Sequence, residues 1–188
     1  MTRIAISGLS GCGATTATAL VAGKLGVPQY NFTLRDLAKE KAMTLEKIQA
    51  IALQDDSVDL EVDRRQAQFA LKNHSWVIGS RLALWLDDKR FVSRTGIMKR
   101  PEIGLKVWLD ASIEKRAERI AKREGGDASK ALPFMQKRDK ENRQRYLRLY
   151  GIDISALPED ALVINTGKMG VKEVAAEIIL LSKQVKKK

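Results

Sequence analysis

The sequence has one cysteine, one histidine and four prolines among its 188 residues, and aromatic residues make up only 5% of it. The lone cysteine, Cys12, excludes an internal disulfide, so we expect a protein of a reducing, cytoplasmic compartment. Long hydrophobic runs are also missing, because the apolar stretch at 4–7 is too short for a signal peptide or a membrane-spanning helix. The length and the 44% hydrophobic content predict one folded domain, which we expect to be monomeric.

Acidic residues are outnumbered by basic ones, 23 to 34, which gives a formal net charge of +11. Such an excess indicates a polyanionic partner, and nucleotide phosphates, RNA or both would satisfy it. Arginines crowd between residues 116 and 148, whereas the lysine-rich tail after residue 182 is interpreted as a solvated helix end. Composition alone leaves the choice of anion open.

Short apolar strands alternate with longer helices along the chain. We expect strands at 3–7, 75–79, 105–109 and 161–164, and helices at 15–25, 113–123 and 171–187. The region 35–72 is expected to be helical, with breaks at 43–44 and 55–57. This alternation predicts an α/β fold with a short parallel sheet flanked by helices on both faces. Ligands of such folds collect at the carboxyl ends of the strands.

A glycine-rich loop follows the first strand directly and is the strongest local motif. Its glycines let the backbone aim amide hydrogens inward, and the following helix adds its positive dipole end, so the loop predicts a phosphate site. Thr15 stands where such loops carry a hydroxyl for magnesium, but Ala14 stands where they carry lysine. Without that lysine, either another cation neutralises the phosphates or the rate is lower. A glycine-rich turn without a ligand is the alternative interpretation. The predicted phosphate-binding residues are Gly8, Leu9, Ser10, Gly11, Cys12, Gly13, Ala14, Thr15 and Thr16.

Two arginine-bearing helices flank the turn at 124–127, which contains paired glycines. Forked guanidinium donors on a segment that closes would suit a lid over a triphosphate, because closure excludes water. A solvated basic surface is the alternative interpretation. The residues that share the two helical faces are Arg116, Arg119 and Arg123 on the first, and Arg138, Asn142 and Arg145 on the second.

Other polar residues have both a chemical and a structural interpretation. Asp59 and Asp63 share one face of the helix at 58–72, where like charges repel unless a base amine or an arginine lies opposite; a solvated helix is the alternative. Cys12 is interpreted as a small filler, with a thiol activated by the helix N-terminus as the alternative. His74 is interpreted as a cap or surface residue and not as a base.

Taken together, these motifs resemble the cytidylate kinases, and most closely their compact archaeal-type branch. The resemblance covers most of the chain and rests on segments at 8–16, 34–40, 59–66, 80–85, 116–124 and 145–153, among them Ser80-Arg81-Leu82-Ala83-x-Trp85 and Tyr150-Gly151-Ile152-Asp153. It implies a three-layer P-loop NTPase fold with its core at 1–28, 74–123 and 147–188. It also implies a helical NMP-binding insertion at 29–73 and a lid at 124–146.

The resemblance implies an enzyme that transfers the γ-phosphoryl of ATP to CMP, or to dCMP or UMP, with Mg²⁺ held by Thr15. Two alternatives stay open. One is a catalytically weak nucleotide-binding protein that holds RNA, which Ala14, the Gly79-Ser80 turn and the +11 charge favour. The other is a kinase for a non-nucleotide acceptor.

Residue roles are likewise implied by the resemblance alone. It assigns the acceptor phosphate to Arg35 and Arg81, and the cytosine edge to Asp63 and Arg64. On the donor side, the resemblance implies contacts with the adenine and with the transferring phosphoryl group. It assigns the adenine to Arg119 and Thr166, and the transferring phosphoryl to Arg123, Arg138 and Arg145.

Overall fold

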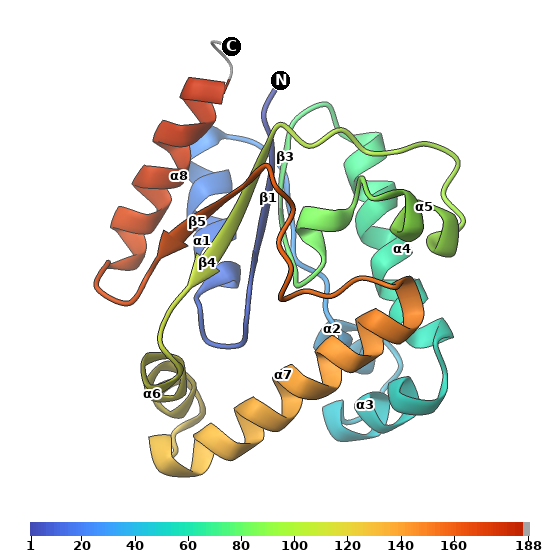
Figure 1. Ribbon diagram of the computed structural model, residues 1–188, viewed down its shortest axis with the longest axis vertical. Coiled ribbons are helices and arrows are strands. Elements are labelled where there is room, and N and C mark those ends of the chain that lie inside the picture. Colours follow the sequence, from blue (N-terminus) through green and yellow to red (C-terminus); the bar gives the residue numbers. More distant parts are fainter. Residues whose placement is uncertain (186–188) are drawn as a thin grey trace.

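In the computed structural model, which describes residues 1–185, five strands form one sheet (Figure 1). The strands are β1 (Arg3–Gly8), β2 (Gln29–Tyr30), β3 (Trp76–Gly79), β4 (Leu105–Asp110) and β5 (Ala161–Asn165). Their order in space is β2-β3-β1-β4-β5, and every neighbouring pair is parallel. All carboxyl ends therefore lie at one edge of the sheet, as the strand–helix alternation predicts.

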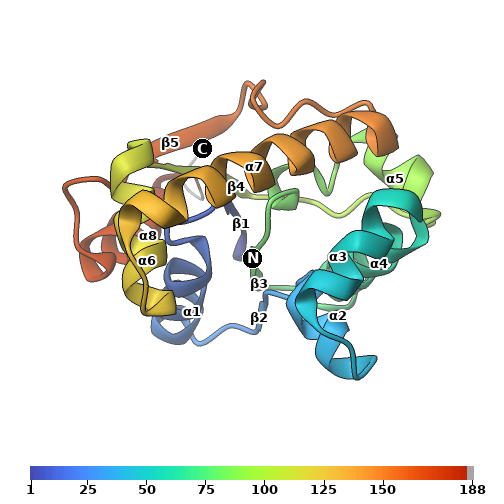
Figure 2. The same cartoon turned by 90° about the horizontal axis from the view of Figure 1, so that it is seen from below.

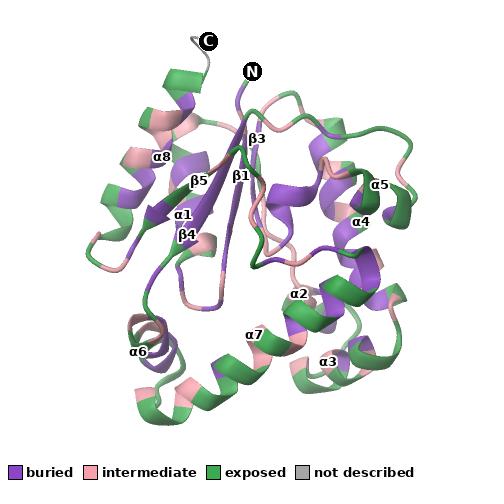
Figure 3. Ribbon diagram, in the orientation of Figure 1, coloured by how far each residue is buried: buried purple, intermediate pink, exposed green. Residues whose placement is uncertain are grey.

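Helices cover both faces of the sheet. They are α1 (Ala14–Leu25), α2 (Leu34–Glu40), α3 (Leu45–Gln54), α4 (Ser57–Lys72), α5 (Lys89–Thr95), α6 (Ile113–Glu124), α7 (Ala128–Tyr150) and α8 (Val171–Val185), with a 3-10 turn η1 (Ala83–Trp85). Side chains alternate across β1, so that Ile4 and Ile6 pack with α1 and α8 while Ala5 faces η1 and α4. Figure 3 shows the consequence, since β1, β3 and β4 are buried throughout most of their length.

Local capping explains where several helices begin and end. α1 ends at Gly26, whose φ of +62° is left-handed, and Thr44 begins α3 by accepting a hydrogen bond from the Lys47 amide at 3.2 Å. The two breaks expected within 35–72 are confirmed, because they separate α2, α3 and α4.

The structure also contains elements that the sequence patterns did not predict. The sheet has five strands where four were expected. The additional strand is the two-residue β2, which pairs with β3 although it carries no apolar run. The segment 87–104, for which no element was expected, contains α5, which begins where the Asp88 side chain accepts a hydrogen bond from the Arg90 amide at 2.8 Å. Helix α8 is described to Val185, and residues 186–188 of the expected helix and tail lie outside the described residues.

Two helical regions lie at the carboxyl edge of the sheet. Helices α2 to α4 share an apolar cluster of their own, in which Leu37, Ile48 and Val62 are buried. Helix α7, which at 23 residues is about 34 Å long, crosses from α6 to the side of α2–α4 (Figure 2). Within residues 1–185, no helix has both the length and the apolar composition needed to cross a membrane.

Candidate functional site

The loop between β1 and α1 turns through two glycines in the left-handed region. Gly11 has a φ of +87° and Gly13 a φ of +93°, conformations that favour glycine. The backbone amides of Gly13, Ala14 and Thr15 donate no hydrogen bond to another group within residues 1–185. Free amides at the N-terminus of a 12-residue helix make an anion-binding site.

Ser10 is the point at which other segments reach this loop. Its Oγ accepts a hydrogen bond from Nη2 of Arg81, a residue in the segment that follows β3. It also accepts one from Nε of Arg138 on α7, at 3.1 Å. The same hydroxyl donates to Asp139 Oδ1 at 2.9 Å. Arg116 Nη1 on α6 donates to the Ser10 carbonyl oxygen at 3.2 Å and to Asp139 Oδ2 at 2.6 Å. The loop is therefore surrounded by guanidinium groups from three separate elements.

Arg81 and Arg138 differ from Arg116 in their electrostatic environment. Arg116 forms an ion pair with Asp139, whereas neither Arg81 nor Arg138 has a carboxylate within ion-pair distance among the described residues. Burial, and after it the charge of Arg81, lower the pKa of Arg138. The Nε of Arg81 is buried without a hydrogen-bond partner in the part of the chain that the structure describes. An entering anion would stabilise both side chains.

Arg119 joins the end of β5 to the phosphate loop. Its two terminal nitrogens donate to Thr166 Oγ1 at 2.9 Å and to the Thr166 carbonyl oxygen at 2.6 Å, and Nη1 lies 3.4 Å from the Gly11 carbonyl oxygen. The hydroxyl of Thr166 also lies within hydrogen-bond distance of the Cys12 and Asp110 carbonyl oxygens. The ends of β1, β4 and β5 thus meet at one place, as the parallel sheet predicts.

The thiol of Cys12 is not activated. Burial raises its pKa to about 11, and the nearby Arg116 charge only partly opposes this effect. The activated-thiol alternative is therefore wrong. Cys12 packs in the apolar layer between the sheet and α1, which confirms its interpretation as a small filler.

The two carboxyls of α4 are buried against α7. Arg145 Nε lies 2.7 Å from Asp59 Oδ2, and the Tyr150 hydroxyl donates to Asp63 Oδ2 at 2.6 Å. Burial raises the pKa of Asp63 to about 7, and the neighbouring charge of Asp59 adds to this effect. The hydrogen bond from Tyr150 and the charge of Arg145 oppose it only in part. An arginine does lie opposite the pair, as expected, and the solvated-helix alternative is wrong because both carboxyls are buried.

Three of the predicted arginines lie on the surface and make no hydrogen bond to the loop. Arg35 is exposed on α2 and has no ion pair among the described residues. Arg64 is exposed and donates through Nε to the Thr95 carbonyl oxygen at 2.9 Å. Arg123 is exposed and pairs with Glu124 at 2.6 Å. The structure therefore separates an inner set of site arginines, at Ser10, from an outer set.

For magnesium, the loop offers the exposed Thr15 as one hydroxyl ligand. Residues 1–185 contain no group of three or more His, Cys, Asp or Glu side chains that could hold a metal ion. Mg²⁺ keeps several waters and binds through one or two protein groups together with substrate phosphates. This donor set fits an ion that arrives with a nucleotide and does not fit a resident metal.

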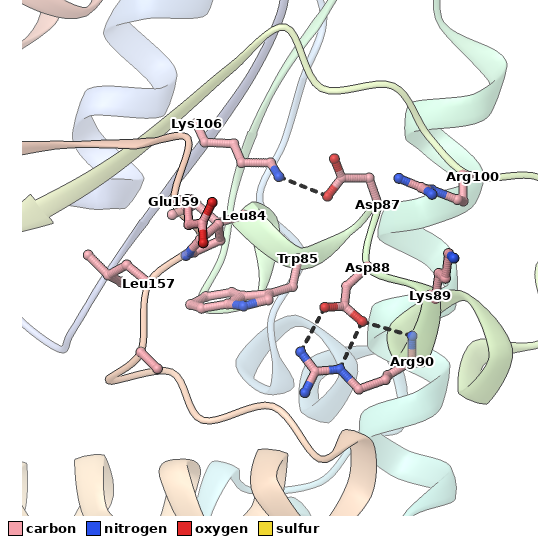
Figure 4. A pocket seen from close by; sticks show the side chains of 12 residues that line it. Leu84, Trp85, Asp87, Asp88, Lys89, Arg90, Arg100, Lys106, Leu157 and Glu159 are labelled. Carbon is pink, nitrogen blue, oxygen red and sulfur yellow. Dashed lines mark hydrogen bonds and ion pairs between the residues drawn. The ribbon is translucent and has the colours of Figure 1, made fainter.

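Two hollows differ in their relation to the loop. One of about 220 Å³ lies between α3 and α7 and is lined in part by Arg138, so it adjoins the arginines at Ser10. The other, of about 570 Å³, lies between the η1–α5 segment and the loop before β5 (Figure 4). No residue of the phosphate loop lines it, and its Lys106 and Arg90 are paired with Asp87 and Asp88. We therefore place the functional site at the phosphate loop.

The sequence analysis assigned no role to two residues of this region. Asp139, which bridges Ser10 and Arg116, is an ordinary helical acid in the sequence and shows no distinguishing spacing. Tyr150 lies 87 positions from its partner Asp63. Contacts between such distant segments leave no periodic signal, although Asp139 directly follows the predicted Arg138.

A phosphate loop at the carboxyl edge of a parallel sheet, faced by arginines from neighbouring helices, defines a P-loop phosphotransferase. The chain belongs to the cytidylate kinase-like family, which matches residues 3–168. It is 42% identical over 175 residues to a cytidylate kinase of Pyrococcus horikoshii, covering 92% of this chain and 84% of that protein. It is 38% identical over 173 residues to a cytidylate kinase of Methanocaldococcus jannaschii, covering 91% and 92%. The resemblance inferred from the motifs is confirmed.

Solved structures confirm the fold class. A deoxyadenosine kinase from M. mycoides with bound dATP has a TM-score of 0.62 at 13% identity and covers 97% of this chain and 100% of its own. A shikimate kinase from Bacteroides thetaiotaomicron has a TM-score of 0.57 at 17% identity, covering 97% and 98%. At these identities the likeness concerns the fold alone.

Proposed function

We propose that the chain transfers the γ-phosphoryl of ATP to CMP, giving ADP and CDP. The observation that carries this proposal is the phosphate loop with free amides, faced by Arg81 and Arg138, which lack carboxylate partners. The relatives named cytidylate kinase support CMP as the acceptor. dCMP and UMP differ from CMP by few groups and are the natural competitors.

The reaction requires positioning and charge neutralisation more than covalent chemistry. An oxygen of the CMP phosphate forms a bond to the γ-phosphorus while the bond to the β-phosphate oxygen breaks, and ADP leaves with that electron pair. The amides at Gly13–Thr15 hold the donor phosphates, and Arg138 and Arg81 neutralise the charge that shifts between donor and acceptor. When bound, Mg²⁺ neutralises donor phosphate charge, and Thr15 would hold it.

The insertion at 29–73 and the lid at 124–146 serve the acceptor and the exclusion of water. Arg35 on α2 joins Arg81 at the acceptor phosphate, and Asp63 with Arg64 meets the cytosine edge. Tyr150 fixes the Asp63 carboxyl, and the Asp59–Arg145 ion pair couples α4 to α7. Closure of these regions would bring the exposed arginines toward the reacting groups.

Two donor contacts complete the arrangement. Arg119 and Thr166 form one hydrogen-bonded unit beside the loop, and we assign the adenine to this unit. Arg123 approaches the transferring phosphoryl on closure, together with Arg138. Arg145, which is buried against Asp59, would join them only if that ion pair opens. Each arginine assignment predicts a loss of ADP formation when the guanidinium is removed.

The test is ADP formation from ATP and Mg²⁺ with CMP, dCMP, UMP and AMP in parallel. We expect CMP to react fastest. Arg138→Ala should lower kcat/KM for CMP about 10³-fold, whereas Lys140→Ala, a change of an exposed cation two residues along the same helix, should change it less than about twofold.

A different outcome would support the alternatives. Tight ATP binding without ADP formation, together with salt-sensitive retention of RNA, would favour the nucleotide-binding protein. ATP consumption only with some other phosphate or alcohol acceptor would favour a kinase of different specificity.

A further inference from the structure

The phosphate loop lacks the lysine that such loops use for the β- and γ-phosphates. Ala14 takes that position, begins α1 and packs against the apolar layer between the sheet and α1. Its side chain offers neither charge nor hydrogen bond. A substitute cation must therefore come from outside the loop, and the candidates are the cations that the fold brings to it.

Most loop-proximal cations are already neutralised or turned elsewhere. Arg116 is paired with Asp139 at 2.6 Å, and Arg119 donates to Thr166. Arg3 is at the opposite end of β1, where it pairs with Glu102. The Ser10 hydroxyl, by contrast, accepts hydrogen bonds from two guanidinium groups that have no carboxylate partner within residues 1–185.

These two groups, Arg81 and Arg138, come from different elements and meet only at Ser10. One follows β3 in the sheet, and the other lies on α7, which crosses the carboxyl edge. Two like charges on one neutral oxygen repel each other. Burial and the charge of Arg81 lower the pKa of Arg138, and the charges of Asp139 and Glu124 oppose this effect only in part. The buried, unpartnered Nε of Arg81 is a second sign that a ligand with acceptor oxygens belongs here.

We propose that Arg81 and Arg138 together replace the missing loop lysine and neutralise the β- and γ-phosphates of the donor nucleotide from outside the loop. Arg81 does this in addition to its assigned contact with the acceptor phosphate. This inference rests on the proposed phosphotransfer. It adds a functional consequence, because one of the two charges belongs to α7. The donor phosphates are fully neutralised only when α7 lies over the loop, whereas a loop lysine would neutralise them in any position of α7.

The test returns the lysine to the loop. Ala14 is only partly buried and packs at the margin of the apolar layer, so a lysine there can extend its stem along apolar surface. We expect Arg138→Ala to lower kcat/KM for ATP about 10³-fold, and Ala14→Lys in that background to restore at least about 10-fold. In the otherwise unchanged chain, Ala14→Lys should give no gain, because it adds a third like charge beside Arg81 and Arg138.

The matched control is Arg119→Ala, which removes another loop-proximal guanidinium that is bonded to Thr166. Ala14→Lys should restore no activity there, since Arg119 is assigned to the base and not to the phosphates. The inference would be overturned if Ala14→Lys rescued Arg119→Ala and Arg138→Ala equally, or rescued neither. The proposed function would still stand in that case, provided that the wild-type chain forms ADP. If the wild-type chain forms no ADP, the same cycle is read from the ATP dissociation constant, and absence of rescue there overturns the inference.

A second comparison covers the case in which the Ala14→Lys proteins do not fold. Arg138→Lys keeps the charge, whereas Arg138→Gln keeps only a hydrogen-bond donor for Ser10. We expect the lysine variant to retain at least about 10-fold more kcat/KM for ATP than the glutamine variant. Equal activities would show that Arg138 acts on Ser10 alone and would overturn the inference.

Discussion

The contact between the phosphate loop and α6 leads to a quantitative prediction for Gly11→Ala. Gly11 has a φ of +87°, and a Cβ built on it would lie 2.6 Å from the Arg116 carbonyl oxygen and 2.9 Å from the Arg116 Cβ. The left-handed backbone costs an alanine about 1–2 kcal/mol. The overlap with a helix backbone adds about 1–3 kcal/mol, because loop or helix must shift. We therefore expect the free energy of unfolding to fall by about 2–5 kcal/mol.

Two other glycines provide matched controls. Gly13 has a φ of +93° and Gly26 a φ of +62°, and a Cβ on either would meet nothing within 4 Å. Gly13→Ala and Gly26→Ala should each lose only the backbone contribution of about 1–2 kcal/mol. Urea unfolding of the three variants, compared at constant m-value, measures these differences.

ATP binding separates the two controls from each other. The open space at Gly13 lies beside the free amides, so its methyl group should obstruct the donor phosphates and weaken ATP binding by calorimetry. Gly26 caps the far end of α1, so Gly26→Ala should bind ATP as the unchanged chain does. If Gly11→Ala were as stable as Gly13→Ala, the close packing of the loop on α6 would be refuted.

Two further predictions concern buried charges. Folding raises the pKa of Asp63 to about 7, from about 3.9 in the unfolded chain. Between these two values the native state binds more protons than the unfolded state. The free energy of unfolding should therefore fall as the pH rises from about 4 to 7. Urea titrations at pH 5 and pH 8 should differ less for Asp63→Asn than for the unchanged chain, and an unchanged difference would assign the proton to another group. Asp139→Ala should cost about 3–5 kcal/mol, because it leaves Arg116 buried and unpaired, whereas Arg116→Met combined with Asp139→Leu should cost less. If urea unfolding shows that the free-energy losses of the two single variants add up to the loss of the double variant, Arg116 and Asp139 are not coupled.

The parts of the fold that could be predicted are those specified by local sequence. The strand before Gly8, the loop and α1 follow from an apolar run, clustered glycines and a terminal glycine, all within 26 residues. The breaks between α2, α3 and α4 follow from Thr44 and from the acidic pair before Ser57. β2 and α5 could not be predicted, because a two-residue strand has no period and α5 depends on the cap at Asp88.

The site shows the same division between local and distant information. Glycines and a hydroxyl at fixed spacing identify a phosphate loop, but they do not reveal which cations approach it. Arg81 and Arg138 reach Ser10 from 71 and 128 positions away. Lys106 shows the same limit inside β4. It is buried there and pairs with Asp87 and Asp160, which come from two separate loops, so its local sequence does not reveal its partners.

The distribution of ion pairs gives an independent reason to locate the anion site at this edge. On the surface, Arg65, Arg90 and Arg143 are neutralised by nearby acids, as are most arginines of the described chain. An arginine without such a partner keeps a charge that only a solvent ion or a ligand can neutralise. Among residues 1–185, the arginines without a carboxylate partner are Arg35, Arg64, Arg81, Arg100, Arg119 and Arg138. All of these except Arg100 were expected as site residues from the resemblance, whereas two other expected site arginines, Arg123 and Arg145, pair with Glu124 and Asp59. Three of the six arginines without a carboxylate partner, Arg81, Arg119 and Arg138, make hydrogen bonds to the phosphate loop, and this favours an anion site at this edge of the sheet.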